Sequence, residues 1–130
     1  MSIFKVKEDS VQELLDNEIG YCPGWHELLT HTFDKILYLC GLFNIDEINV
    51  GQIKEKFGTL RMYISYSPTN YDVTLCKLQL EILHDIESAA EKRSAMICQN
   101  SGKYGTIRDV CGWYATLSDE EYEKELKKRK

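Results

Sequence analysis

Two histidines are the first residues whose types and spacing could do chemistry. His26 begins and His31 ends the run His-Glu-Leu-Leu-Thr-His, which is similar to the metal-binding helix of zinc proteases. In that motif the histidines stand four residues apart, so both imidazoles face one metal ion. Here the step is five, which rotates the second imidazole by about 140° on a helix of 3.6 residues per turn. We therefore expect both histidines to face solvent or cap a helix, with no metal between them.

A cysteine nucleophile is the second candidate for chemistry. Cys22 precedes Pro23 and lies near His26, so a Cys–His pair is conceivable, but one cysteine near one histidine is more typical of a structural turn. The sequence contains neither a Gly-x-Ser-x-Gly elbow nor a glycine-rich phosphate loop. We predict a protein that is not an enzyme and that needs no cofactor.

The segment 98–121 has the pattern of a zinc ribbon that lacks most of its ligands. Cys98 begins a Cys-x-x-Cys-Gly-like run in which Ser101 replaces the second cysteine. A second run is similar to Thr-Leu-Cys-x-x-His, with Ser118 in place of the cysteine and Glu121 in place of the histidine. A structural zinc site needs four good ligands, and a serine hydroxyl is a poor one. We predict no zinc at this position.

Without zinc, the ribbon-like segment needs other contacts to hold it. We expect Trp113, Tyr104, Ile107 and Leu117 to pack its short hairpin. A residual metal site that combines Cys98 and Cys111 with ligands from elsewhere stays open. The five cysteines are spread along the chain and odd in number, so we predict reduced thiols, mostly in the core.

Several of these runs together resemble a known group of proteins. The runs are Tyr-Cys-Pro-Gly-Trp at 21–25, Gln-Ile-Lys-Glu-Lys-Phe-Gly-Thr-Leu-Arg-Met-Tyr at 52–63, Ala-Ala-Glu-Lys-Arg-Ser at 89–94 and the ribbon-like end. Over roughly residues 20–121 the chain resembles a family of small uncharacterised bacterial and prophage proteins with a Val-Lys-Glu-Lys-Phe-Gly-x-Leu-Arg-Phe-Tyr core, often with an intact zinc ribbon. The resemblance implies a bacterial or phage origin and no particular mechanism.

The run from Lys54 to Tyr63 has two interpretations. Lys54, Lys56 and Arg61 would lie near a turn beside Phe57 and Tyr63, and cations beside aromatic rings suit a phosphate, a nucleic acid or an acidic protein surface. Alternatively, the charges flank an ordinary hairpin, Phe57 packs inward and the glycine at 58 makes the turn with a positive φ. The second interpretation is the one we favour from sequence.

The elements that would carry these residues follow from periodicity and capping signals. A capping box at Ser10 starts a helix near residue 11, and apolar residues spaced three and four apart predict a stronger helix over 25–40, which Gly41 ends. Alternation predicts strands over about 48–52 and 59–66, with a turn at 56–58 and another at 67–70. A long helix over about 72–93, a short hairpin at 104–116 and a helix after the Ser118 capping box complete the chain.

This order predicts one α+β domain over residues 1–130. A small antiparallel sheet, made of the central hairpin and the short C-terminal hairpin at about 97–121, packs with three to four helices. The long helix repeats apolar or small residues along one face, where Glu87 is the exception. A second apolar group on that helix leads us to expect burial on more than one side; it consists of Leu75, Leu78, Ile82 and Ile86.

Composition limits the class of protein. The chain has 130 residues, 43% of them hydrophobic, so it is long enough to form one hydrophobic core. Its formal net charge of -5 makes nucleic acid an unfavourable partner. It shows neither a signal sequence at its start nor an apolar run long enough to span a membrane. We therefore expect a soluble protein of the bacterial cytoplasm that binds another protein.

Two functions fit these limits. The first is an immunity or inhibitor protein that neutralises a bacterial toxin, possibly a basic nuclease, through acidic clusters. Its candidate contacts are Asp46, Glu47, Asp85, Glu87, Glu91, Asp119, Glu120 and Glu121. The second is a phage or mobile-element accessory that binds a host defence or nucleic-acid-processing complex through the Lys54–Tyr63 run and the ribbon-like segment. The oligomeric state stays open.

Overall fold

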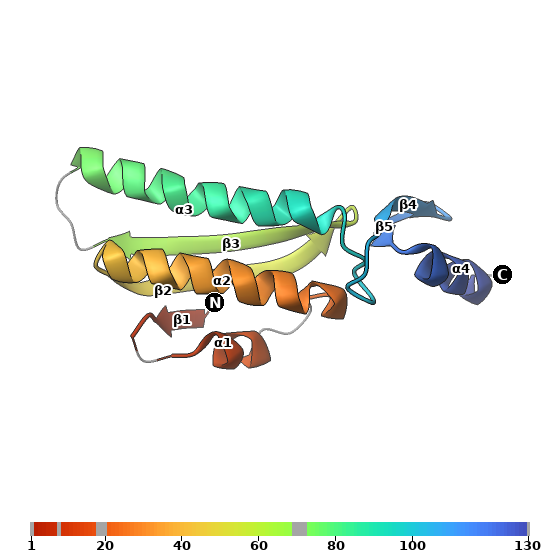
Figure 1. Cartoon of the computed structure of the whole chain (residues 1–130), viewed down its shortest axis with the longest axis horizontal. Helices are drawn as coiled ribbons and strands as arrows, with labels where there is room; N and C mark the ends of the chain where they lie inside the picture. Colours follow the sequence, from red (N-terminus) through yellow and green to blue (C-terminus); the bar gives the residue numbers. More distant parts are fainter. Residues whose placement is uncertain (1, 8, 18–20, 69–72, 130) are drawn as a thin grey trace.

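A three-stranded antiparallel sheet, two long helices on one of its faces and a separate hairpin with a terminal helix make up the structure (Figure 1). It is a computed structural model that describes residues 2–7, 9–17, 21–68 and 73–129. The elements in chain order are β1 (Ser2–Lys5), α1 (Val11–Asn17), a 3₁₀ turn (Pro23–Trp25), α2 (His26–Leu42), β2 (Ile45–Lys56), β3 (Thr59–Pro68), α3 (Val73–Ser94), β4 (Thr106–Val110), β5 (Trp113–Leu117) and α4 (Asp119–Lys128). The predicted α+β class is confirmed.

The main sheet has the order β1-β2-β3, and β4 pairs with β5 in a second, two-stranded sheet. The sequence analysis predicted no strand before residue 11, so β1 is an addition; it pairs along the edge of β2, with Phe4 opposite Ile48. Four residues are too few to show a clear alternation. β2 is also longer than predicted, and an irregularity between Val50 and Gln52 shifts its register. Ile53 is thereby buried, whereas Gln52 is exposed.

Several predicted boundaries need comment. The side chain of Ser10 accepts a hydrogen bond from the amide of Glu13 at 3.1 Å, as the capping box predicted. The helix expected to stop at Gly41 continues to Leu42, and Asn44 takes the left-handed φ of 59° that ends it. The turn expected at 67–70 and the helix start expected at residue 72 lie largely outside the described residues.

The turn between β2 and β3 consists of Phe57 and Gly58, whose φ values of 53° and 86° are both positive. Two consecutive positive φ values match the tight hairpin turn that suits the twist of antiparallel strands. The amide of Gly58 donates to Glu55 Oε1 at 2.6 Å, which fixes the turn. The positive φ of Gly58 is confirmed. The inward packing expected of Phe57 is wrong, because its side chain is 68% exposed.

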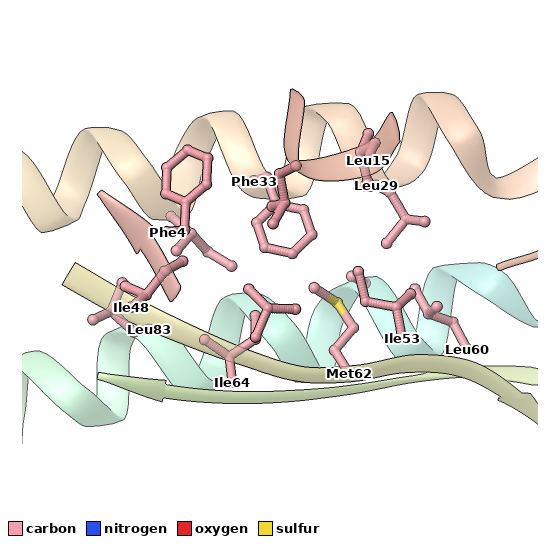
Figure 2. Packing of buried hydrophobic residues seen from close by; sticks show 14 of the residues in the cluster. Phe4, Leu15, Leu29, Phe33, Ile48, Ile53, Leu60, Met62, Ile64 and Leu83 are labelled. Carbon is pink, nitrogen blue, oxygen red and sulfur yellow. The ribbon is translucent and has the colours of Figure 1, made fainter. Parts of the chain in front are cut away.

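The main core lies between the sheet and helices α1, α2 and α3 (Figure 2). Helix α2 contributes residues at the predicted three- and four-residue steps, among them Leu29, Phe33 and Ile36, all fully buried. The inner sheet face contributes Ile48, Val50, Ile53, Leu60, Met62 and Ile64. No helix of the described residues covers the opposite face of the sheet, whose side chains are largely exposed (Figure 1).

Polar side chains of α3 cover the outer edge of β3. Ser94 Oγ accepts a hydrogen bond from the amide of Leu60 at 2.8 Å, and Glu91 Oε1 accepts one from the amide of Met62 at 3.2 Å. Glu87 Oε2 accepts from the hydroxyl of Tyr66 at 2.9 Å. Steps of four and three residues place these three side chains on one face of the helix. The helix thus satisfies two amides of an edge that would otherwise invite pairing with another chain.

The C-terminal hairpin docks on the main sheet unit through backbone contacts at two glycines. The amide of Gly24 donates to the carbonyl of Gln99 at 2.8 Å, and a Cβ on Gly24 would lie 2.0 Å from the carbonyl oxygen of Cys98. At the second contact, Thr116 Oγ1 donates to the carbonyl of Gly58 at 2.6 Å. A Cβ on Gly58 would approach the backbone of Ala115 to 3.2 Å. Both contacts need residues without side chains.

A small second core holds the C-terminal unit together. Cys98, Val110, Ala115 and Leu117 are buried in it, and Trp113, Tyr122 and Leu126 pack around them. The expected contributions of Leu117 and Trp113 are confirmed. Those of Tyr104 and Ile107 are wrong, since their side chains are 74% and 47% exposed. Helix α4 supplies the missing packing, beginning at Ser118, whose hydroxyl accepts from the amide of Glu121 at 3.3 Å.

None of the five cysteines, all of which lie in the described residues, forms a disulfide; two are buried, two half-buried and Cys111 is exposed. The reduced state stays a prediction. Among the described residues, no helix combines the length and the apolar character that crossing a membrane requires.

The docking of the C-terminal unit can be tested with two glycine substitutions. We expect Gly24→Ala to lower the free energy of unfolding by at least about 2 kcal/mol, because its Cβ would collide with backbone that cannot move alone. Gly41→Ala is the matched control: nothing lies within 4 Å of its Cβ, and alanine is the better helix former by about 0.5–1 kcal/mol. Urea denaturation measures both. Equal effects would contradict the close approach at Gly24.

The buried Glu87 predicts a pH dependence. Burial raises the pKa of its carboxyl above 4.5, although hydrogen bonds from Tyr66 and His84 oppose the shift. A raised folded-state pKa means that the folded protein binds the extra proton, so this group's contribution to stability falls as pH rises through and above the ordinary carboxyl range. We expect Glu87→Gln to remove this loss and raise the melting temperature at pH 8. The gain should shrink at pH 4, as measured by thermal denaturation at both pH values.

Candidate functional site

The residues predicted in the Lys54–Tyr63 run gather on the open face of the sheet. Lys54 pairs with Arg61 across the two strands, Lys56 pairs with Thr59, and Gln52 pairs with Tyr63. All of these side chains therefore point away from the face that carries Ile53 and Met62. We define the basic sheet face as the surface made by Lys54, Lys56, Phe57, Arg61 and Tyr63.

Each lysine of the basic sheet face lies over an exposed aromatic ring. Lys54 Nζ is 5.5 Å from the ring centroid of Tyr63, and Lys56 Nζ is 5.8 Å from that of Phe57. The rings are 48% and 68% exposed. These cation–π contacts hold the lysine side chains in place without neutralising their charge. Large exposed aromatic rings and fixed cations are typical of contact surfaces for macromolecules.

Arg61 continues the basic sheet face toward helix α3. Its Nη1 atom lies 3.6 Å from Glu91 Oε2, and its side chain is 40% exposed. The same carboxylate accepts the amide of Met62, so Glu91 orients Arg61 while covering the strand edge. This arrangement places the guanidinium at the border of the face, where it is partly neutralised.

Tyr114 is a further exposed aromatic residue at this end of the sheet, which the sequence analysis placed only in the short hairpin. It is 47% exposed and precedes Ala115, whose backbone lies against Gly58. β5 therefore brings Tyr114 to the tip of the β2–β3 hairpin, close to the turn that contains Phe57. No local sequence signal could have found this proximity, because the two segments meet through backbone atoms.

The acidic candidates do not form one surface. Asp46 and Glu47 line a shallow hollow together with Lys5 and Lys7. Asp85 lines a groove between α2 and α3 that also contains Lys35 and Arg93.

The acidic residues of α4 are matched by cations as well. Asp119 pairs with Arg108, and Lys124 Nζ lies 3.5 Å from Glu120 Oε1 and 3.0 Å from Glu121 Oε2. The hydrogen bond and charge of Lys124 hold the pKa of Glu121 below its usual range. These carboxylates are thus balanced within α4 and β4.

Glu87 and Glu91 were predicted as surface contacts, and the structure gives them other roles. Glu87 is only 7% exposed and bonds Tyr66, so a direct contact with a partner is wrong for this residue. The burial of Tyr66 raises the pKa of its hydroxyl, and the charge and hydrogen bond of Glu87 raise it further. The hydroxyl therefore stays a hydrogen-bond donor. Glu91 is held at the edge of β3.

The ribbon-like segment forms a tight turn after Cys98, where the amide of Gly102 donates to the carbonyl of Cys98 at 2.9 Å and the amide of Cys98 donates to the carbonyl of Lys103 at 2.7 Å. Burial raises the pKa of the Cys98 thiol, but hydrogen bonds from the Ser101 side chain and from backbone amides of Ser118, Ser101 and Asn100 leave that pKa below its ordinary value of 9.0. Ser101 and Ser118 therefore lie next to Cys98, and Asn100 connects this turn to Glu121. Hydrogen bonds thus link the four positions at which the ribbon pattern would place ligands.

Cys111 lies far from this network. It occupies the turn between β4 and β5 with a φ of 54°, whereas Cys98 lies at the opposite end of that hairpin, where the amide of Gln99 bonds Thr116. A strand of five residues separates the two ends. A site combining Cys98 and Cys111 is therefore wrong, and the described residues contain no group of three or more His, Cys, Asp or Glu side chains placed to hold a metal ion.

The histidine and cysteine candidates have structural surroundings. His26 Nδ1 lies 2.9 Å from the hydroxyl of Tyr21, and the two rings stack with centroids 6.1 Å apart. His31 is exposed, as expected. Burial, with the charge of Glu55, raises the pKa of Cys22 to about 11, so its sulfur is a thiol and a poor nucleophile at neutral pH.

The apolar residues expected to bury a second side of α3 are largely uncovered. Leu75, Leu78 and Ile82 are exposed, so the prediction of burial on more than one side is wrong for the chain by itself. The periodic pattern identified the stripe but could not show that no element of the described chain covers it.

Comparison with known proteins adds no further identification: no family model matches the chain, and neither a curated protein nor a solved structure is significantly similar to it.

The convergence of the degenerate ligand positions can be tested by rebuilding them. We expect the triple variant Ser101→Cys/Ser118→Cys/Glu121→His to bind one Zn²⁺ tightly and to melt at a higher temperature with zinc than without, because thiolate and imidazole then surround Cys98. Cobalt absorption spectra and thermal melts measure this. A variant with Cys98→Ser added is the control. Absence of cobalt–thiolate absorption in the folded triple variant would contradict the convergence.

Proposed function

We propose that this protein is a non-enzymatic binding protein of the immunity or inhibitor type, which neutralises a bacterial toxin by occupying its surface. The observation that carries the proposal is the basic sheet face, where predicted contact residues from two strands and their turn lie together and exposed. Aromatic rings that anchor a contact while their fixed cations set its specificity suit tight recognition of a protein.

The charge of this face defines the complementary partner surface. Lys54 and Lys56 project from an acidic chain, so the contacting toxin surface would be acidic and partly apolar rather than basic. The ion pairs that Glu91, Asp119, Glu120 and Glu121 form with cations support the same choice. A basic nuclease bound through the acidic clusters is thus the less favoured form of the proposal.

A second candidate function is supported by one observation. The tip of the basic sheet face adjoins the ribbon-like hairpin through Gly58 and Thr116, so both segments could contact one partner. This is the surface expected of a phage or mobile-element accessory that binds a defence or nucleic-acid-processing complex. Open sheet faces with cations and aromatic rings also suit single-stranded nucleic acid, whose binding would weaken steeply with salt.

The proposal is tested by affinity capture from a native host extract with the tagged full chain. We expect one toxin domain in stoichiometric amount with the wild type, and at least about a tenfold lower yield with Lys54→Glu/Lys56→Glu, because reversed charges repel an acidic surface. Mass spectrometry at low and moderate salt measures the yield.

The matched control is Asp46→Lys/Glu47→Lys, which changes the same amount of charge in the acidic hollow. It should retain the toxin. If only the control variant loses the toxin, the contact site lies in the acidic clusters instead. Salt-sensitive recovery of nucleic acid or of a defence complex would favour the second candidate function.

A further inference from the structure

Helix α3 carries an apolar stripe along the flank that it shares with helix α2. Leu75, Leu78, Ile82, Ile86 and Ala89 recur at steps of three and four residues, so they share one flank of the helix. Leu78 is 53% exposed and Ile82 45%. A regular stripe of this kind is typical of a helix that packs against another helix.

Helix α2 extends this stripe into a groove. The two helices lie side by side and run in opposite directions (Figure 1). Their groove has a volume of about 290 Å³ and is lined by Thr32, Lys35, Ile82, Asp85, Ile86, Ala89 and Arg93. Leu42, near the end of α2, is 61% exposed. The helical layer therefore presents apolar surface on the side opposite to the basic sheet face.

The charges in the groove have mixed sign. Lys35 comes from α2, while Asp85 and Arg93 come from α3. Within the described residues none of these three forms an ion pair. A groove with Lys35 on its α2 side and Asp85 on its α3 side is complementary to a copy of itself, because a two-fold axis along the groove exchanges the two sides.

We propose that the α2–α3 face is a homodimer interface, in which a second copy packs its own α3 stripe into the groove. A two-fold axis that runs along the groove, centred on Ile82 and Ile86, sets the apolar linings of the two grooves against each other. Because this axis exchanges the α2 and α3 sides of the groove, it brings Lys35 of each copy toward Asp85 of the other. The apolar stripe supplies the contact area, and the two reciprocal ion pairs set the register.

This inference does not depend on the proposed function, because the dimer interface and the basic sheet face lie on opposite layers. It is tested by sedimentation equilibrium of the full chain over a range of concentrations. The wild type should be dimeric, and Ile82→Glu should be monomeric, since it places a charge in the centre of the apolar contact. The control Tyr104→Glu changes an even more exposed apolar residue outside the groove and should leave the dimer intact.

Charge reversal then tests the register. Lys35→Asp and Asp85→Lys should each weaken dimerisation by more than about tenfold, because like charges meet across the axis. The double variant Lys35→Asp/Asp85→Lys should restore it to within about threefold of wild type. Circular dichroism confirms that each variant is folded.

Three results would overturn the proposal: a wild type that stays monomeric at every concentration, a dimer that survives Ile82→Glu, or a double reversal that remains as weak as the single ones. Monomeric wild type would instead leave the groove to an amphipathic helix of another protein.

Discussion

The outer edge of β3 imposes the constraint from which the rest of the structure follows. Its amides must be hydrogen-bonded, because a free edge ten residues long would pair with other chains. Ser94 and Glu91 of helix α3 accept hydrogen bonds from two of these amides, and Glu87 accepts one from the hydroxyl of Tyr66. The helix therefore lies along the strand edge in one fixed rotation. That rotation turns its apolar stripe away from the strand and toward the flank that it shares with α2.

The same constraint decides which charged residues remain for recognition. Carboxylates that cover the edge or neutralise neighbouring cations contribute to folding, and burial makes Glu87 costly to ionise. The residues on the open face of the sheet neither cover a strand edge nor pack in the core, so Lys54 and Lys56 lie beside exposed aromatic rings. An acidic overall charge thus coexists with the basic sheet face, which net charge alone conceals.

Periodicity sufficed to predict most elements, since the alternation of Leu60, Met62 and Ile64 and the apolar steps of α2 report directly on burial. Periodicity failed where the position of a side chain depends on the local turn geometry or on backbone from a distant part of the chain. Phe57 is exposed because the turn takes positive φ at both positions, and the need for Gly24 arises only when residue 98 arrives from far along the chain. The residues of the basic sheet face could be named from sequence because they alternate within one hairpin, although the sequence favoured an ordinary hairpin there. The exposure of one side of α3 could not be predicted, since periodicity identifies an apolar flank but does not show whether another element packs against it.

The two-layer architecture keeps the proposed surfaces apart. Helices α2 and α3 separate the groove from the sheet, so a second copy docked there leaves the basic sheet face of each chain open (Figure 1). A two-fold dimer would display two such faces, and a toxin with two copies of its own contact site would be held with higher avidity than one face provides. The ribbon-like unit lies at one end of the chain, anchored at Gly24 and Gly58. Its anchoring next to Phe57 supports the tip of the hairpin, and a rigid tip loses less conformational entropy when a partner binds.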